Sequence, residues 1–204
     1  MRKKIMTILA AVMFLTAAAA EVSAQEVLMN SAETINPGNL KLAIFPTVLF
    51  GKDGGDSVWG VATRVGYGIS ARFDIEAKVS FFKGIKYFGV DVEYWLIKGG
   101  NLNVSVALGG HMTDLPGNHG DSSGIDVCLL ASTSPVRNLE IYGGFKAAFD
   151  SVKNSDINYT RLYVVPGIEY RISDDLDFLA EVGIALNDNS RSYASVGLAL
   201  YLLR

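Results

Sequence analysis

The sequence is poor in the residues that form disulfides and catalytic sites. It has one cysteine, Cys128, and two histidines, His111 and His119, among 204 residues. A single cysteine cannot form an internal disulfide, so the fold must be stable without one. Because Cys128 lies inside a predicted strand, we expect a small packed side chain there rather than a reactive thiol.

Positive charge is also scarce. The chain has 18 Lys and Arg against 21 Asp and Glu, which gives a formal net charge of −3. No basic stripe is present to neutralise phosphates, and this argues against nucleic acid as a partner. The sequence identifies no protein partner.

Long apolar runs are missing after the first two dozen residues. Basic residues 2–4 precede an apolar run over residues 5–20, and small residues follow at 22–24. This pattern predicts a secretory signal peptide over residues 1–24. A transmembrane helix needs about 20 apolar residues, and the remaining chain offers no such run. Strands must therefore make any membrane crossing.

The rest of the chain is a series of segments in which apolar and polar residues alternate. Residues 25–39 precede it and end in a turn-forming run at 36–39, so we expect a periplasmic N-terminal leader there. Alternation has the period of a β-strand, and a tilted strand of about 9 to 11 residues crosses a bilayer. One barrel domain over residues 40–204 is predicted, with strands at 40–50, 57–69, 71–83, 85–97, 101–112, 122–134, 138–149, 158–171, 175–187 and 191–203.

The connections between these segments alternate in length. Short turns on one rim and longer loops on the other are typical of transmembrane β-barrels, whose short turns are periplasmic. The pattern predicts an all-β, antiparallel up-and-down transmembrane barrel of ten strands, or of eight if two segments only extend the rim. An even number places both termini on the periplasmic side. The short connections lie around Ser70, 98–100, 135–137 and 173–174, the longer ones at 51–56, 113–121, 150–157 and 188–190, and a short exception at 83–85.

The two faces of each segment differ in polarity. In the third segment Phe73 and Ile75 lie on one face while Asp74 and Glu76 lie on the other, because strand side chains alternate sides. Extended round the barrel, this rule gives a lumen charge network with six positive and nine negative members: Lys41, Arg64, Asp74, Glu76, Lys78, Asp91, Glu93, Asp126, Glu140, Lys146, Arg161, Glu169, Arg171, Asp177 and Glu181.

The apolar face has the character of a lipid-facing surface. Its strand charges are Lys83 and Lys86, both beside one hairpin. A charge at mid-bilayer on this face costs about 2 to 4 kcal/mol, which explains why charges are so few there. The aromatic residues of this face fall at two levels, as expected of girdles at the two membrane interfaces: Phe50, Trp59, Phe81, Phe88 and Phe149 near the long loops, and Tyr67, Phe73, Tyr94, Tyr170 and Phe178 near the short turns.

Alternation alone does not say which face points outward. A secreted soluble barrel would turn the apolar face inward around a hydrophobic ligand. The end of the chain favours the membrane interpretation, because its alternating apolar residues resemble the C-terminal insertion signal of outer-membrane barrels. The residues that carry it are Ser195, Gly197, Leu200 and Leu202, although the chain ends in Leu203-Arg204 and not in Phe or Trp.

With these features the mature chain resembles the small outer-membrane β-barrel superfamily, which includes OmpA-like and OmpW-like barrels. The resemblance implies export to the outer membrane of a Gram-negative envelope and recognition by the barrel-insertion machinery. It also implies contact with outer-membrane lipid and lipopolysaccharide. Lys83 and Lys86, at the outer rim, carry the charge to pair with lipopolysaccharide phosphates.

The lumen allows two interpretations. Buried charges persist when paired, so the network indicates a structural set of salt bridges, and its acidic excess also allows a narrow cation-preferring path. We therefore expect a non-enzymatic, porin-like envelope scaffold or surface-interaction protein, at most a small-solute or ion channel.

An enzyme is the remaining alternative, since the segment from His111 to Ser123 contains His, Asp and Ser side chains. The barrel lipid A deacylases use a His-x-Ser motif, but here Thr113 stands two residues after His111. A lipid hydrolase using His111 stays an open alternative. No ligand spacing supports a metal site, and we expect no cofactor.

Overall fold

The computed structural model describes residues 30–52, 55–99, 101–114, 121–153 and 155–202. The predicted signal peptide at 1–24, the first residues of the predicted leader, His119 and the last two residues lie outside this part. In the described part the elements are β1 (Leu40–Leu49), β2 (Val58–Ser70), β3 (Phe73–Phe82), β4 (Ile85–Ile97), β5 (Asn103–Asp114), β6 (Ser122–Val136), β7 (Leu139–Val152), β8 (Asn158–Ser173), β9 (Leu176–Ala185) and β10 (Tyr193–Leu202).

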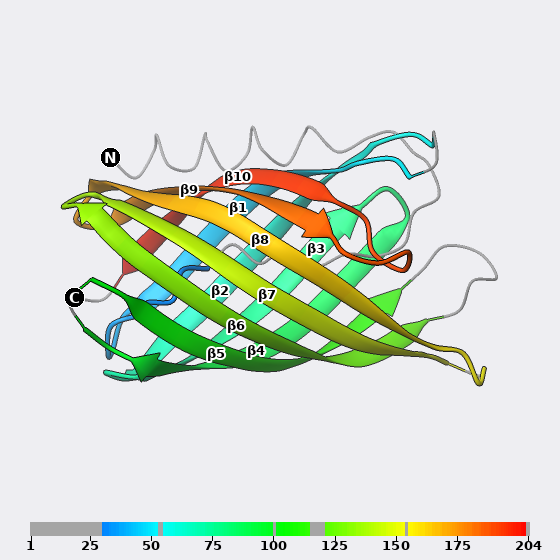
Figure 1. Cartoon of the computed structure of the whole chain (residues 1–204), viewed down its shortest axis with the longest axis horizontal. Helices are drawn as coiled ribbons and strands as arrows, with labels where there is room; N and C mark the ends of the chain where they lie inside the picture. The colour runs from blue at the N-terminus through cyan, green and yellow to red at the C-terminus, as the bar shows by residue number, and fades with distance from the viewer. Residues whose placement is uncertain (1–29, 53–54, 100, 115–120, 154, 203–204) are drawn as a thin grey trace.

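The strands close into one barrel in which each pairs with its sequence neighbours (Figure 1). The closure is antiparallel and joins β1 to β10, from Leu40 beside Leu202 to Leu49 beside Tyr193. The prediction of a ten-stranded up-and-down barrel is confirmed, and the eight-stranded alternative is wrong. Each predicted segment corresponds to one strand, and the ends differ by at most three residues. In the described residues no helix is long and apolar enough to cross a membrane.

The short turns share a structural device. The register shifts between Gly68 and Ser70, between Trp95 and Ile97, between Thr133 and Val136, and between Arg171 and Ser173. All four shifts lie where β2, β4, β6 and β8 reach their hairpin turns. An irregularity of this kind bends the strand and ends regular pairing, and it is common at barrel rims. The turns between these strand pairs form the short-turn rim.

The opposite rim, the long-loop rim, carries the connections after β1, β3, β5, β7 and β9. The β3–β4 hairpin is a short connection on this otherwise long-loop rim, and its Gly84 has a φ of 76°. Glycine adopts this left-handed conformation without the steric cost that a Cβ atom imposes. The glycine therefore explains why this one connection is as short as those on the other rim.

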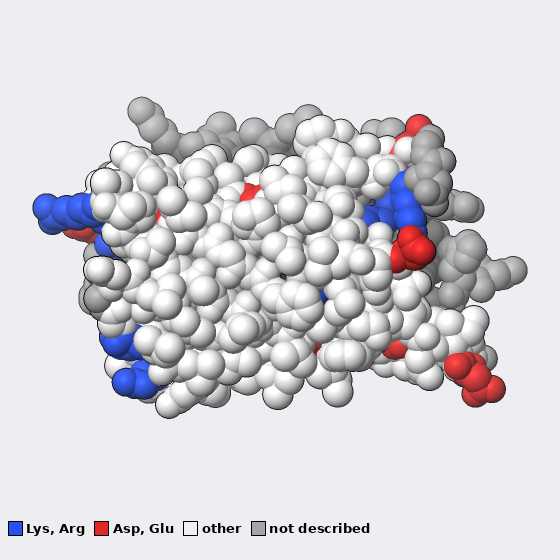
Figure 2. All heavy atoms as spheres, in the orientation of Figure 1, with Lys and Arg blue, Asp and Glu red and all other residues white. Residues whose placement is uncertain are grey.

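The outer wall between the rims is apolar. Leu108, Phe145 and Val196, from three strands, are each about half exposed. Figure 2 shows a barrel side that is almost free of charged atoms, with Lys, Arg, Asp and Glu gathered at its two ends. The apolar face therefore points outward, so the soluble barrel with an inward apolar face does not fit.

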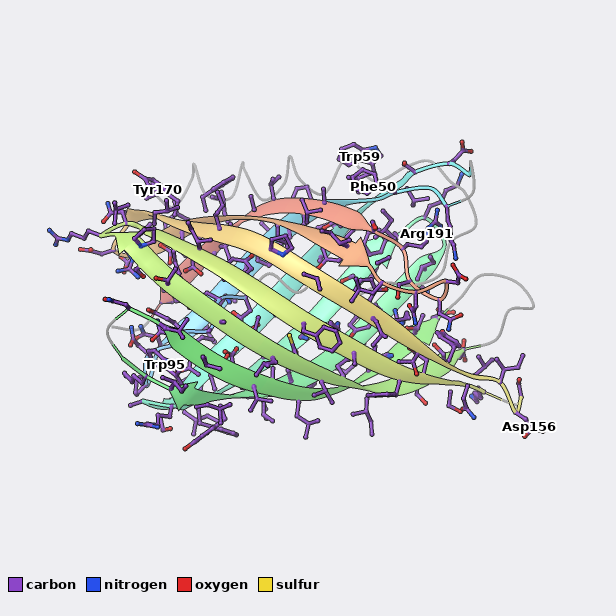
Figure 3. All side chains as sticks on the ribbon, in the orientation of Figure 1. Phe50, Trp59, Trp95, Asp156, Tyr170 and Arg191 are labelled. Carbon is purple, nitrogen blue, oxygen red and sulfur yellow. The ribbon has the colours of Figure 1, made fainter. Side chains whose placement is uncertain are left out.

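The predicted girdle aromatics lie on this outer wall. Trp59 is 72% exposed. Figure 3 shows Trp59 and Phe50 near the long-loop rim and Tyr170 near the short-turn rim. Phe73 and Phe178 are half-buried, and the others are exposed. In the C-terminal motif, Leu200 is half-buried and Leu202 is exposed. Ser195 and Gly197 are buried.

Candidate functional site

The inward faces of the described strands carry most of the predicted lumen charge network. Of the predicted lumen charge network, Asp91, Glu140 and Glu169 are half-buried. Arg171 lies at the short-turn rim with a side chain that is 53% exposed, 3.8 Å from Asp177. The remaining members are buried: Lys41, Arg64, Asp74, Glu76, Lys78, Glu93, Asp126, Lys146, Arg161, Asp177 and Glu181.

Glu76 is the centre of the charge cluster in the short-turn half of the lumen. Its Oε1 accepts from Lys41 Nζ at 2.9 Å, and its Oε2 accepts from Arg64 Nη1 at 2.9 Å. These three residues come from β3, β1 and β2, so the cluster links adjacent strands through their inward faces. Both carboxylate oxygens are used, as a buried charge requires.

The segment from Asn30 to Asn39, which we call the N-terminal plug, enters the lumen from the short-turn rim. Asn30 accepts from Lys41 Nζ at 2.8 Å and donates to Glu93. The backbone N–H of Ile35 donates to Asp74 Oδ2 at 2.7 Å, and Asn103 donates to Glu33 at 2.9 Å. The expected leader before the barrel is, in its described part, a filling of the barrel mouth.

Glycines make room for the plug. A Cβ atom at Gly66 would meet the side chain of Ile35, and one at Gly68 would meet the backbone of residues 35 and 36. The backbone of Gly68 also exchanges hydrogen bonds with the plug, accepting from Gly38 at 2.8 Å and donating to Asn39 at 3.1 Å. The fit between β2 and the plug is therefore built into the backbone.

A second cluster lies in the long-loop half and is centred on His111. Its Nδ1 is 2.7 Å from Asp126 Oδ2, and its Nε2 is 2.8 Å from Asp150 Oδ1. Arg161 binds Asp150 through Nε and Nη2, both at 2.9 Å, which is the bidentate geometry of a strong ion pair. Tyr87 stacks on the His111 ring at a centroid distance of 5.3 Å.

Further polar pairs lie in the lumen between the two clusters. Tyr142 and Tyr193 donate to the two oxygens of Glu181 at 3.0 and 2.6 Å. Lys78 forms an ion pair with Asp91. Lys146 lies 3.6 Å from Asp126. Polar pairs therefore occupy this part of the lumen as well.

Part of the interior is apolar, although the sequence marked the inward face by its charged residues. Phe45, Leu130, Val165 and Leu179 are fully buried in one contiguous group with Cys128. Cys128 is a free buried thiol, as expected of a small packed side chain. The lumen is thus a core with polar and apolar regions, as in a small barrel whose interior is filled by side chains.

Two small cavities lie among the described residues of the interior. One cavity of about 10 Å³ is lined by residues that include Arg64 and Glu93. Another of about 50 Å³, at the short-turn mouth, is lined by Glu33, Glu169 and Tyr201 among others. A single water needs roughly 10 to 15 Å³, so these cavities hold small numbers of waters.

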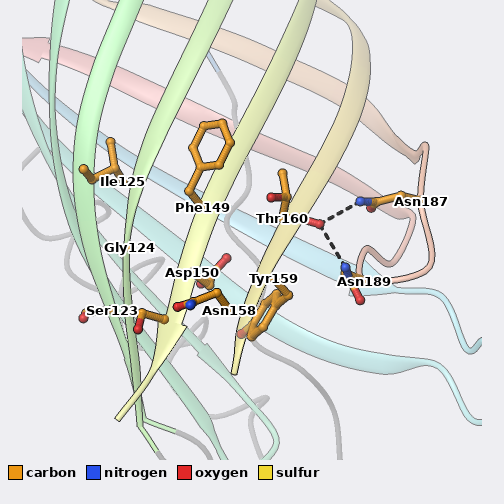
Figure 4. A pocket seen from close by; sticks show the side chains of 11 residues that line it. Ser123, Gly124, Ile125, Phe149, Asp150, Asn158, Tyr159, Thr160, Asn187 and Asn189 are labelled. Atoms are coloured by element: carbon orange, nitrogen blue, oxygen red, sulfur yellow. Dashed lines mark hydrogen bonds between the residues drawn. The ribbon is translucent and has the colours of Figure 1, made fainter. Parts of the chain in front are cut away.

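A larger pocket of about 700 Å³ opens to solvent at the long-loop rim, beside β6, β7 and β8 (Figure 4). The connection after β9 forms one of its walls. There Asn187 and Asn189 both donate to the carbonyl oxygen of Thr160, at 2.7 and 3.3 Å. These bonds satisfy the edge of β8 where it extends beyond β9. Asp150, at the floor of the pocket, is already bound by His111 and Arg161.

The hydrolase and metal interpretations gain no support from this geometry. Both ring nitrogens of His111 lie within 2.8 Å of a carboxylate oxygen, so neither is left to take a proton from a hydroxyl. His111 lies in β5 and is 4% exposed, rather than in a surface turn region. Among the residues described, no group of three or more His, Cys, Asp or Glu could hold a metal ion.

Two members of the long-loop cluster were absent from the predicted network. His111 has the same parity as Asn103 and Ser105, which face the lumen, and Asp150 has the same parity as Lys146. Extending the faces to the strand ends would have identified both. The plug carried no comparable signal, because residues 30–35 show no alternation.

Comparisons with known proteins support the fold. No family model matches the chain, and no curated protein matches it. Among solved structures, the COG4313 outer membrane channel from Pseudomonas putida F1 aligns with a TM-score of 0.56 and 8% identity over 87% of this chain and 100% of that chain. The NanC porin aligns with a TM-score of 0.50 and 11% identity over 79% of this chain and 100% of that chain.

A weaker similarity is to the outer membrane protease OmpT from Escherichia coli, with a TM-score of 0.45 and 10% identity over 84% of this chain and 100% of that chain. The first two alignments cover nearly all of the barrel. At these identities they concern architecture and not activity. The chain has the fold of the small outer-membrane β-barrels.

Proposed function

We propose that this protein is a non-enzymatic outer-membrane β-barrel with a closed lumen, acting as an envelope scaffold or surface-interaction protein. The observation that carries the proposal is the filled interior, in which Glu76 and His111 centre two buried networks and the plug occupies one mouth. Such an interior holds the strands together and leaves no path of the width of a porin channel.

The membrane placement follows from the outer wall. A surface of half-exposed Leu, Val, Ile and Phe between two charged rims suits lipid and not water. The predicted signal peptide and C-terminal insertion signal supply the route, through export and the barrel-insertion machinery. The short-turn rim, where β1 begins and β10 ends, would then face the periplasm.

Planar-bilayer recording of the refolded full chain tests the closed lumen. We expect no steady conductance at moderate voltage, with a 16-stranded porin as the positive control in the same membrane. A regular, reproducible single-channel conductance of the wild-type protein would contradict the proposal. Heat-dependent migration on gels would show that the sample tested is a folded barrel.

A small cation-preferring channel is the second candidate. Two observations favour it: the two solved structures with the higher TM-scores are described as a channel and a porin, and the predicted network has more acidic than basic members. If conductance is found, a salt gradient should give a reversal potential of the sign for cation preference. An anion-preferring pore would contradict this candidate.

At the long-loop rim we propose contact with lipopolysaccharide through Lys83 and Lys86. Lys86 is 68% exposed and lies 3.2 Å from Asp114, and Lys83 is half-buried beside it. Charge reversal at both positions should weaken lipopolysaccharide association measured by co-purification. Unchanged association would refute this contact and leave the barrel proposal intact.

A further inference from the structure

We propose that the short-turn rim binds the phosphates of anionic phospholipids through one Lys or Arg at each of its four turns. The inference rests on the proposed membrane placement and adds a lipid class to it. The cations are Arg72 between β2 and β3, Lys98 between β4 and β5, Arg137 between β6 and β7, and Arg171 at the end of β8. All four residues are exposed.

The four cations fall into two pairs on neighbouring turns. The Arg72 carbonyl accepts from Trp95 N at 2.9 Å, and Lys98 Nζ donates to the carbonyl of Ala71 at 3.3 Å, so these two turns touch. In the other pair, the N–H of Arg171 donates to the carbonyl of Asn138, beside Arg137, at 2.8 Å. Figure 2 shows blue atoms at the short-turn end in separate upper and lower groups.

The positive charge of this rim is not fully neutralised. Among the described residues, Arg72, Lys98 and Arg137 have no carboxylate within ion-pair distance, while Arg171 lies 3.8 Å from Asp177. The acids here are the exposed Asp174 and Asp175 and the buried Asp177 that pairs with Arg171, so cations exceed acids by four to three.

The long-loop rim is different. It has five described cations, Lys52, Lys83, Lys86, Lys153 and Arg191, and five acids, Asp56, Asp114, Asp121, Asp156 and Asp188. Two of these cations are paired with acids, Lys52 with Asp188 at 3.3 Å and Lys86 with Asp114 at 3.2 Å. Excess positive charge is therefore a property of the short-turn rim and not of barrel ends in general.

The depth of the cations suits a phosphate. Tyr94 and Tyr170 are 44% and 46% exposed on the lipid-facing wall. Tyrosine prefers the headgroup level of a bilayer. Arg171 follows Tyr170 directly, and Lys98 lies four residues after Tyr94 at the end of the same strand. Lys98 and Arg171 thus stand just beyond the interfacial aromatics, at the level expected for the phosphates of the adjoining leaflet.

The chemistry favours an anionic lipid. Guanidinium groups bind phosphate oxygens through two parallel N–H donors, and an ammonium group binds them as a point charge. Lys98 is also held over the Trp95 ring at 4.3 Å, which fixes its direction at the rim. A surface of this kind attracts phosphatidylglycerol more strongly than the zwitterionic phosphatidylcholine.

Spin-label spectroscopy measures this preference directly. The full chain is refolded in phosphatidylcholine vesicles that contain trace spin-labelled phosphatidylglycerol or phosphatidylcholine, and the motionally restricted fraction gives the ratio of association constants. We expect a preference for phosphatidylglycerol of roughly threefold to tenfold, reduced by high salt. The triple variant R72Q/K98Q/R137Q should bring the ratio close to one.

The matched control is K52Q/K153Q/R191Q, which removes the same charge from the long-loop rim and leaves Lys83 and Lys86 in place. It should keep the wild-type ratio. The proposal is overturned if the folded wild type shows no preference, or if both triple variants lose it equally. Binding to isolated peptidoglycan that only the first variant loses, without a lipid preference, would also overturn it and assign the rim to that polymer.

The heat-dependent gel shift separates this inference from the proposed function. A wild type that neither inserts nor shifts would refute the membrane barrel itself. A chain that inserts and shifts but does not distinguish the two lipids would refute the phosphate rim alone.

Discussion

At the scale of single residues, the carboxylate of Glu76 holds two buried cations, Lys41 and Arg64, at 2.9 Å each. Glu76→Gln removes the charge and keeps the shape, so both cations lose this carboxylate in a buried site. We expect this variant to lower the free energy of unfolding by about 3 to 5 kcal/mol. Urea titration in lipid vesicles measures it.

The control for Glu76→Gln is Lys86→Gln, which breaks the exposed pair with Asp114. An exposed pair of this kind contributes at most about 1 kcal/mol. Equal effects of the two variants would mean that the lumen pairs are as solvated as the rim pairs, contrary to a filled interior.

Glycine packing gives a second residue-scale prediction. A Cβ atom at Gly124 would meet the backbone oxygen of Phe149 and the His111 ring, whereas one at Gly143 would meet nothing within 4 Å. Gly124→Ala should therefore destabilise the barrel by about 1 to 3 kcal/mol, while Gly143→Ala should be neutral or slightly stabilising. The same titration tests both, and a Gly124→Ala variant as stable as wild type would show that the His111 cluster is loosely packed.

Residue faces were predictable wherever a strand has one polar side. Asp74, Glu76 and Lys78 of β3 were placed together by parity, and the structure buries all three. Phe45 and Leu49 share the parity of Lys41, but their own polarity does not mark this face as the interior one, because both faces of β1 carry apolar side chains. There the choice of face depends on which neighbours complete the interior, and this is not a local property of the sequence.

At the scale of elements, the N-terminal plug is the feature that sequence periodicity missed. Asn30, Thr34 and Ile35 are buried, although the segment forms no strand. Its partners Lys41, Asp74 and Glu93 come from three strands, so only the closed barrel brings them together. The strands themselves were predictable, because a two-residue period is written within each segment.

A refolded chain that begins at Asn36 tests the role of the plug. Loss of the preceding residues leaves Asp74 and Glu93 without the Ile35 and Asn30 donors. We expect the barrel to form, with its heat-dependent gel shift, but with a free energy of unfolding lower by about 1 to 3 kcal/mol for each charged acceptor left unsatisfied. The control is the full-length chain with the substitution Asn36→Ala, because Asn36 is exposed.

Two results would contradict the stabilising role of the plug. The truncated chain could equal wild type in stability, which would mean that water replaces the plug without loss. Alternatively, Asn36→Ala could reproduce the full loss, which would place the effect in the turn before β1 and not in the lumen contacts.

At the scale of the whole molecule, the apolar wall predicts a dependence on depth. Leu108 lies near the middle of β5 and is 53% exposed, while Met112 lies towards the long-loop rim and is 60% exposed. In a bilayer, Leu108→Lys should cost about 2 to 4 kcal/mol and Met112→Lys about 0 to 1 kcal/mol. Unfolding titrations in vesicles should separate them, and equal small costs would indicate that water covers this wall.

The measurement that tests the central claim most directly is cell fractionation followed by electrophoresis of unheated and boiled samples. A closed barrel with its apolar wall in lipid should sediment with the outer membrane and migrate differently after boiling, because heat is needed to unfold it in detergent. Recovery as a soluble periplasmic protein with one mobility would contradict the account and would mean that this outer wall does not face lipid.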